Sequence, residues 1–269
     1  MTSDFQLIWM RFSGWMLAAC LAGAPLAGGQ TPAPSPAAPA VAQKTVQASR
    51  LVVVLDAAHG GDDGGGQLGA SVAEKTVTLA LSVRLRSLLA ARGFTVVTTR
   101  EGNVNLDNDA RAQIANHATA GANAAACLSL HASQAGTGVH IFVSSLAGTE
   151  ATRFLAWKTA QSAFVVRSLK LAGTVNSALE HSSASGGGDS NTGPIPATLS
   201  RASLPGLDSL TCAALAIEVA PMRDADRKVV TEVTDPQYQA QVVEALAAAL
   251  LEWKTDVETD SRGGKEPLP

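Results

Sequence analysis

Aromatic residues are scarce in this chain: they make up 4% of its 269 residues, and there is a single tyrosine. The sequence therefore offers no evident platform on which bases or sugars could stack. Lysine and arginine are spread along the chain, and the formal net charge is -3. A nucleic-acid partner usually requires a concentrated basic face, so this class of partner is excluded. The G-x-S-x-G motif of a serine hydrolase is also missing, which excludes that class of enzyme.

Cysteine is rare, with three residues in the chain. Cys127 and Cys212 each fall in an apolar run that is typical of a strand interior, and neither belongs to a C-x-x-C pair of the kind used in thiol redox or zinc sites. We expect both to be buried thiols rather than partners in a disulfide.

The first 29 residues predict an export signal. Arg11 supplies one positive charge, an apolar stretch of small residues follows at 12–26, and the stretch is too short and too rich in glycine and proline to span a membrane. Leu17-Ala18-Ala19-Cys20 resembles a bacterial lipoprotein box, so lipidation at Cys20 and ordinary signal cleavage both stay open. We expect an exported protein of the periplasm or cell envelope, with no membrane span and with a lipid anchor at Cys20 as the open alternative.

The rest of the chain divides into three parts. Residues 30–50 are rich in proline and alanine and predict an extended linker without core residues. Residues 51–254 are long enough for one domain with a sizeable core. Residues 255–269 are charged and contain glycine, which predicts a disordered tail.

Within 51–254, apolar strands alternate with amphipathic helices. We expect strands at 51–56, 94–99, 125–131, 138–145 and 210–219, and helices at 74–92, from Asp107 to about 120, at 149–180 and from Asp235-Pro236 onward, with a loop at 182–193. This alternation predicts an α/β fold: a single domain with a mostly parallel, twisted sheet and helices on both faces.

The glycine-rich loop after the first strand raises a choice between phosphate and metal. Gly69-Ala-Ser-Val-Ala-Glu74-Lys75-Thr76 nearly matches the phosphate-binding pattern G-x-x-x-x-G-K-[ST], but Glu74 stands where glycine is required. A carboxylate there would point at the phosphate, so the pattern disfavours a nucleotide.

The same residues favour a metal. Ligands in α/β sheets bind at the carboxyl ends of strands, where we place His59, His131 and Glu218. With Glu74 at the start of a helix, His59 and His131 provide two imidazoles and one carboxylate, which is a known ligand set for catalytic zinc. The glycines then allow the chain to loop from His59 to Glu74.

Several segments together resemble one family. "VVLDAAHGGDDGG", "EKTVTLALSVRL", "RAQIANHA", "AAACLSLHAS" and "AALAIEV" are similar to the zinc-dependent N-acetylmuramoyl-L-alanine amidases of the amidase-3 family, over about residues 51–253. The resemblance implies one zinc ion held by His59, Glu74 and His131, a catalytic glutamate at Glu218, and a mostly parallel sheet between helices. Two stretches depart from the family pattern: Ala57-Ala58 replaces Pro-Gly, and Ala220-Pro221 replaces Gly-Phe after Glu218.

The function implied by this resemblance is hydrolysis of the amide between N-acetylmuramic acid and L-alanine in peptidoglycan. Glu218 would act as general base on water and then as general acid toward the amine. Peptidoglycan is the implied partner, and an activator protein that opens the site is compatible with the sequence. The alternative is a cell-wall-binding relative with little or no turnover, acting as a scaffold or regulator. The presence of Glu218 favours the enzyme.

The remaining polar residues receive mainly structural interpretations. Asp62 and Asp63 are expected to be solvated turn residues. His117 and His140 have no partner at metal spacing, and His181 ends a predicted helix, where a positive charge is favourable. All three are expected to be structural. Residues Arg100, Arg111 and Asn116 resemble family positions near the sheet, with a role in holding the fold or the site.

Overall fold

The computed structural model describes residues 51–69, 71–150, 156–182 and 193–263. The expected signal peptide with Cys20, the Pro/Ala-rich linker and most of the 182–193 loop lie outside these residues. In the part that is described, no helix is both long enough and apolar enough to cross a membrane.

The centre of the fold is a six-stranded sheet in the order β4-β1-β5-β8-β6-β7. Its strands are β1 (Leu51–Ala57), β4 (Thr95–Thr98), β5 (Ala124–Ala132), β6 (Val139–Ser144), β7 (Ala197–Ala202) and β8 (Ala213–Val219). β4, β1, β5 and β8 are mutually parallel, whereas β6 runs antiparallel to β8 and β7 runs parallel to β6. The predicted mostly parallel sheet is therefore confirmed.

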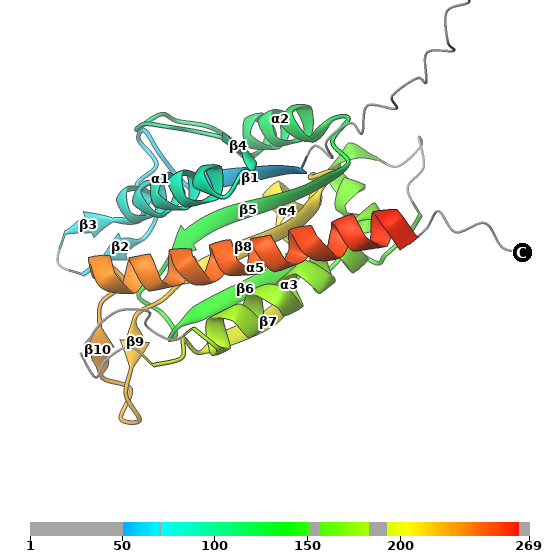
Figure 1. Ribbon diagram of the computed structural model, residues 1–269. Helices are drawn as coiled ribbons and strands as arrows, with labels where there is room; N and C mark the ends of the chain where they lie inside the picture. The colour runs from blue at the N-terminus through cyan, green and yellow to red at the C-terminus, as the bar shows by residue number, and fades with distance from the viewer. Residues whose placement is uncertain (1–50, 70, 151–155, 183–192, 264–269) are drawn as a thin grey trace, which may run out of the picture. The chain divides into compact units, whose positions relative to one another are not determined.

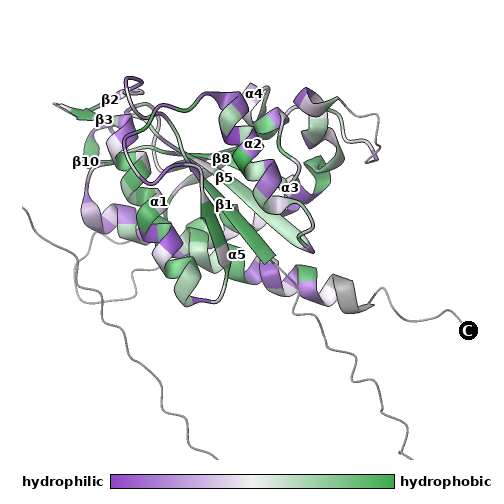
Figure 2. Cartoon of the chain, turned by 90° about the horizontal axis from the view of Figure 1, so that it is seen from above, coloured by the Kyte–Doolittle hydropathy of each residue, from purple (hydrophilic) through white to green (hydrophobic). Residues whose placement is uncertain are grey.

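Helices cover both faces of the sheet. On one face, α5 (Pro236–Gly263) packs alongside α1 (Glu74–Ala91) and α3 (Val165–Glu180), as Figure 1 shows. On the other face lie α2 (Asn108–Thr119) and the short α4 (Pro205–Asp208), next to the 3-10 helix η1 (Trp157–Ala163). Figure 2 shows the hydrophobic strands β1 and β5 between these two helical layers.

The alternation of side chains along β1 explains why this strand is apolar throughout. Val53 and Leu55 join the core beneath α1, α3 and α5, and Val52 and Val54 join a second core beneath α2 and α4. A strand that is buried on both faces needs apolar residues at every position. Near the C-terminal end of the strand, Asp56 introduces the first polar side chain.

Two helix boundaries confirm the sequence interpretation. The Asp107 carboxylate accepts a hydrogen bond from the Ala110 N–H at 2.7 Å and caps α2. α1 ends at Ala91, and Gly93 follows with a φ of 79°, a conformation that favours glycine.

The expected single helix at 149–180 is wrong. Of this range, η1 and α3 are helical and 151–155 lie outside the described residues. Thr159 has a non-helical φ of -125° inside η1, and Phe164 separates the two helices. The buried Gln161 side chain donates from Nε2 to the carbonyl oxygens of Leu210 and Cys212 at 2.9 and 3.0 Å, which ties η1 to the segment before β8.

The C-terminal boundary also differs from the prediction. α5 continues to Gly263, so residues 255–263 are helical rather than a disordered tail. The reason is that Val257 lies one turn beyond the buried Trp253 and packs against the same core. The short strands β2 (Gln67–Leu68), β3 (Val72–Ala73), β9 (Met222–Arg223) and β10 (Val229–Thr231), together with β7 and α4, are not predicted from the sequence.

The expectation of two free thiols is wrong as well. Cys127 and Cys212 form a disulfide across 85 positions of sequence, with their Cα atoms 6.1 Å apart. The register of β5 and β8 brings them together, because Cys127 lies opposite Ala214 and Cys212 immediately precedes β8. The bond joins the start of β8 to the middle of β5 beneath α2.

Candidate metal centre

His59 lies directly after β1, in a turn that fixes its imidazole. The residue has a φ of 61°, which is uncommon for a residue with a side chain. Gly60 and Asp63 exchange two backbone hydrogen bonds, and the Asp63 Oδ2 atom lies 2.8 Å from His59 Nδ1. Asp63 is therefore more than a solvated turn residue, which corrects the sequence interpretation. Hydrogen bonds from His59 and from the Gly65 N–H lower the pKa of the Asp63 carboxyl.

Glu74 is the first residue of α1 and is 6% exposed. Its Oε2 atom lies 3.1 Å from His59 Nε2 and accepts from the Gly66 N–H at 2.8 Å. Its Oε1 atom lies 3.1 Å from His131 Nδ1 and accepts from the Ala132 N–H at 3.1 Å. Burial raises the pKa of this carboxyl, but the hydrogen bonds outweigh burial and lower it to about 2. Glu74 is therefore a carboxylate at neutral pH.

The phosphate-loop alternative gains no support from this geometry. The Lys75 Nζ atom donates to the carbonyl oxygen of Gly61 within the loop, and the Glu74 carboxylate occupies the place where an anion would bind. A phosphate there would meet a negative charge rather than converging N–H groups.

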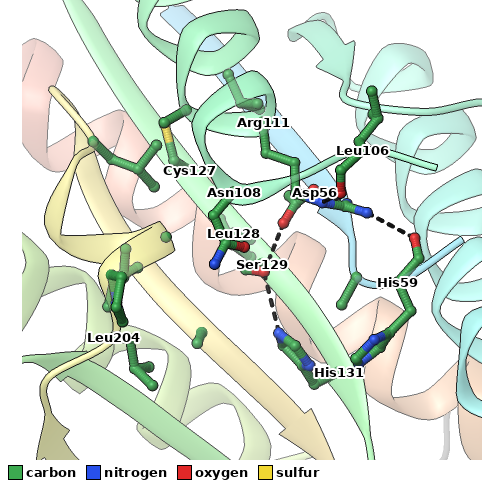
Figure 3. A pocket seen from close by; sticks show the side chains of 18 of the residues that line it. Asp56, His59, Leu106, Asn108, Arg111, Cys127, Leu128, Ser129, His131 and Leu204 are labelled. Atoms are coloured by element: carbon green, nitrogen blue, oxygen red, sulfur yellow. Dashed lines mark hydrogen bonds and ion pairs between the residues drawn. The ribbon is translucent and has the colours of Figure 1, made fainter. Parts of the chain in front are cut away.

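His131 is positioned by β5 and by a chain of polar contacts. Its Nε2 atom lies 3.4 Å from the Ser129 Oγ atom, and that hydroxyl donates to Asp56 Oδ2 at 2.8 Å. Asp56 in turn forms an ion pair with Arg111, with 2.6 Å between Oδ1 and Nη1. Figure 3 shows this chain leading from the Arg111 guanidinium to the His131 ring. Since Ser129 donates to Asp56, its oxygen is free to accept from His131 Nε2.

These contacts fit a metal ion. One possible ligand atom from each of His59, Glu74 and His131 lies within 4.8 Å of the other two. The imidazole atoms nearest the Glu74 carboxylate are His59 Nε2 and His131 Nδ1. Asp63 accepts from the other nitrogen of His59, and Ser129 can accept from the other nitrogen of His131. With these acceptors, each imidazole can adopt the tautomer that leaves its inward nitrogen without a proton when a metal ion replaces the contact with Glu74. The set of two nitrogens and one carboxylate oxygen suits zinc.

Glu218 lies in the same row of the sheet as His131. The register of β5 and β8 places His131 opposite Glu218, and the antiparallel pairing of β8 with β6 places His140 opposite Glu218 on the other side. His140 Nδ1 lies 3.7 Å from Glu218 Oε1. The interpretation of His140 as merely structural therefore needs correction. Only the antiparallel register of β6, which the sequence does not reveal, brings it to Glu218.

The other two histidines do not belong to the candidate metal centre. His181 ends α3, where its Nδ1 atom lies 2.8 Å from the Ser177 carbonyl oxygen. His117 lies in the last turn of α2 and is not among the described residues that could share a metal ion.

A cavity of about 250 Å³ opens beside His59 and His131, on the face covered by α2 and α4. Figure 3 shows His59 and His131 at one end of this cavity and Cys127 and Leu204 farther along it. Its polar wall carries Asp56, Ser129 and Asn108, and its apolar wall is formed by Leu106, Leu128, Leu204, Leu207 and Leu210.

Three further residues that resemble family positions stabilise the backbone around the site. Arg100 is buried, and its guanidinium donates to the carbonyl oxygens of Ala57 and Ala58; burial lowers the pKa of this group. Arg111 donates to the His59 carbonyl oxygen at 2.7 Å and so supports directly the turn that carries His59. Asn116 bonds to Ser209 and Thr211 and anchors the segment before β8.

Residues 53–252 match the model of the Amidase_3 family, described as N-acetylmuramoyl-L-alanine amidase. The chain belongs to this family. A curated relative, the germination-specific N-acetylmuramoyl-L-alanine amidase of Bacillus subtilis (strain 168), is 41% identical over 58 residues. That stretch covers 22% of this chain and 24% of the relative, so the aligned part is about a quarter of that protein.

Solved structures of amidases share the fold. N-acetylmuramoyl-L-alanine amidase AmiC2 of Nostoc punctiforme matches 77% of this chain and 98% of its own, at 20% identity and a TM-score of 0.54. Ami1 from Mycobacterium smegmatis matches 76% and 96%, at 20% identity and a TM-score of 0.55. The CwlD amidase from Clostridioides difficile, solved in complex with the GerS lipoprotein, matches 76% and 98%, at 18% identity and a TM-score of 0.50. At these identities the likeness concerns the fold.

Proposed function

We propose that this chain is a zinc-dependent N-acetylmuramoyl-L-alanine amidase. It hydrolyses the amide that joins the lactyl group of N-acetylmuramic acid to L-alanine in peptidoglycan. The observation that carries the proposal is the convergence of His59, Glu74 and His131, with Glu218 opposite His131 in the sheet. Family membership supports the identity of the bond.

His59, Glu74 and His131 would hold one zinc ion through Nε2, a carboxylate oxygen and Nδ1. A zinc ion in such a ligand set supplies Lewis-acid chemistry, making water more acidic and polarising a carbonyl oxygen. Asp63 and Ser129 would keep the two imidazoles in the tautomers that this role requires.

Glu218 would carry the proton. Its carboxylate removes a proton from the attacking water and then delivers it to the nitrogen of the departing L-alanine amine, as general base and then general acid. The side chain is partly exposed, at 31%, so a substrate can reach it. Among the described residues no arginine pairs with it, which argues against a purely structural ion pair.

The proposal extends to the setting of the protein. An exported amidase acts in the periplasm or cell envelope on peptidoglycan, and residues 1–29 are the proposed export signal, with lipidation at Cys20 as its open alternative. An activator protein is also proposed as a partner, in line with the GerS lipoprotein in complex with the structurally similar CwlD amidase.

The test is incubation of the purified full chain with purified peptidoglycan, with and without a zinc chelator. Mass spectrometry would then detect stem peptides that carry a free L-alanine amine. We expect release that the chelator abolishes and added zinc restores. No release from a protein that contains zinc would favour a wall-binding protein or a missing activator. No release and no bound zinc would refute the metal centre.

A further inference from the structure

In the described part of the chain, the side chain of Glu218 has one ionisable neighbour, His140. His140 Nδ1 lies 3.7 Å from Glu218 Oε1, and in the described part of the chain no other ion pair or hydrogen bond to the Glu218 side chain is present. The distance exceeds that of a hydrogen bond, but a small rotation of either side chain would close it. The two side chains are 24% and 31% exposed. Their strand neighbours Ile141 and Ile217 belong to the core beneath α1, α3 and α5, so alternation places both side chains on the opposite face of the sheet.

The His140 ring is packed against a glycine, which fixes its place. A Cβ atom added to Gly136 would lie 2.2 Å from His140 Cε1 and 2.6 Å from Nε2. Gly136 also has a φ of 82°, which other residues rarely adopt. The absence of a side chain at Gly136, in the loop before β6, therefore leaves space for the His140 imidazole.

That loop is tied to the segment after β8. The Arg223 guanidinium donates from Nε to the Gly136 carbonyl oxygen and from Nη2 to the Gln134 carbonyl oxygen, both at 2.8 Å. Gly138 and Ala220 are joined by a backbone hydrogen bond of 2.8 Å. The loop beneath the His140 ring therefore keeps a constant position relative to the strand that carries Glu218.

We propose that His140 is a positioning residue for the Glu218 general base. Nδ1–H of the imidazole donates to Oε1 and holds the carboxylate, which leaves Oε2 to take the proton of water and pass it to the amine nitrogen. The His140 proton itself is not transferred. This inference rests on the proposed function, and it assigns to His140 an effect that acts through Glu218 alone.

The test compares four variants of the zinc-loaded full chain: His140→Phe, His140→Asn, Glu218→Gln and the double variant His140→Phe/Glu218→Gln. Phenylalanine keeps the ring without a donor, and asparagine keeps a donor near the Nδ1 position. We expect His140→Phe to lower kcat about 10- to 100-fold with little change in KM or zinc content. His140→Asn should recover most of that loss. The double variant should be no slower than Glu218→Gln, because His140 has no effect once the carboxylate is gone.

Three results would overturn the inference. A His140→Phe protein with wild-type kcat would show that His140 does not position Glu218. If the fold-losses in kcat of the two single variants multiply in the double variant, His140 acts independently of Glu218. The third readout needs no turnover: Glu218→Gln should shift the His140 imidazole nitrogen resonances in NMR, and unchanged resonances contradict the contact. This last measurement also decides the matter if His140→Phe fails to fold. Failure of the wild-type protein to release peptides would count against the proposed function instead.

Discussion

The Oδ2 atom of Asp63 lies 2.8 Å from Nδ1 of His59, on the side of the ring that faces away from Glu74. A carboxylate in this place fixes the tautomer and the orientation of a ligand histidine and strengthens its basicity. The aspartate is mostly exposed, and its importance comes from this single contact rather than from burial.

Replacement of Asp63 by alanine should weaken zinc binding about 10- to 100-fold, the usual cost of losing such a partner. Asp62→Ala is the matched control, because it removes an adjacent exposed carboxylate that has no described contact with His59. Competition with a fluorescent zinc chelator measures both affinities. Equal affinities of the two variants would show that Asp63 does not support the ligand.

Gly65 provides a second test of the metal centre. A Cβ atom at Gly65 would lie 2.5 Å from His59 Cδ2 and 2.7 Å from Glu74 Oε2, whereas one at Gly69 would meet nothing within 4 Å. Both glycines have a positive φ, 67° and 56°, so alanine costs about 1 kcal/mol or more of backbone strain at either site. We expect Gly65→Ala to lose zinc affinity and Gly69→Ala to retain it. Zinc titration together with thermal melting separates the two effects, and loss of affinity in both variants would contradict the steric argument.

Glu218 and His59 should behave differently when replaced. Glu218→Gln keeps the size of the side chain but removes the base, so zinc content should stay at the wild-type level while turnover falls about 100- to 10,000-fold. His59→Ala should lose both zinc and turnover, because one of three ligands is gone. Metal analysis and peptide release are measured on the same samples. A Glu218→Gln protein with near wild-type turnover would remove Glu218 from the mechanism.

The extent to which these residues could be predicted depends on how local their contacts are. His59, Glu74 and His131 follow from the ends of regular elements, and the structure brings their side chains together as expected. Strand alternation and the Asp107 cap are also local features. By contrast, the contact of His140 with Glu218 requires the antiparallel register of β6, and the Cys127–Cys212 bond requires the register of β5 and β8.

Residue type and composition also gave wrong predictions where tertiary contacts determine the local structure. Thr255 begins a stretch whose composition favours disorder, yet Val257 extends the apolar face of α5 and keeps the stretch helical. Asp63 is a typical turn residue by type, and only closure of the turn between Gly60 and Asp63 directs its carboxylate to His59. In each case the decisive partner is a particular atom that composition does not identify.

The disulfide should contribute substantially to stability. Cys127 and Cys212 close a loop across 85 positions, for which loop entropy gives roughly 4 to 5 kcal/mol and typical measurements about 2 to 4 kcal/mol. In a Cys20→Ser background, reduction should lower the melting temperature by about 5 to 15 °C. The Cys127→Ala/Cys212→Ala variant should melt near the reduced protein and be insensitive to reductant. A wild-type melting temperature unchanged by complete reduction would contradict this contribution.

Tyr238 makes stability depend on alkaline pH. Its hydroxyl is buried and donates to the Ala220 carbonyl oxygen at 2.8 Å, and burial raises the pKa of the phenol above its usual value of about 10. Above that value the unfolded chain loses the phenol proton while the folded chain keeps it. The free energy of unfolding should therefore fall as pH rises, by at most about 1.4 kcal/mol per pH unit from this group.

The stability difference between Tyr238→Phe and the wild-type protein should shrink as pH rises. At neutral pH the variant should be about 1 kcal/mol less stable, because the Ala220 carbonyl oxygen loses its donor, but it should lack the added alkaline decline. Urea denaturation of both proteins between about pH 8 and 11 measures this difference. Since Tyr238 is the only tyrosine, tyrosinate absorbance reports on it alone and should appear only with unfolding. Ionisation of the native protein near pH 10 would show that the phenol is not held in its buried, neutral form.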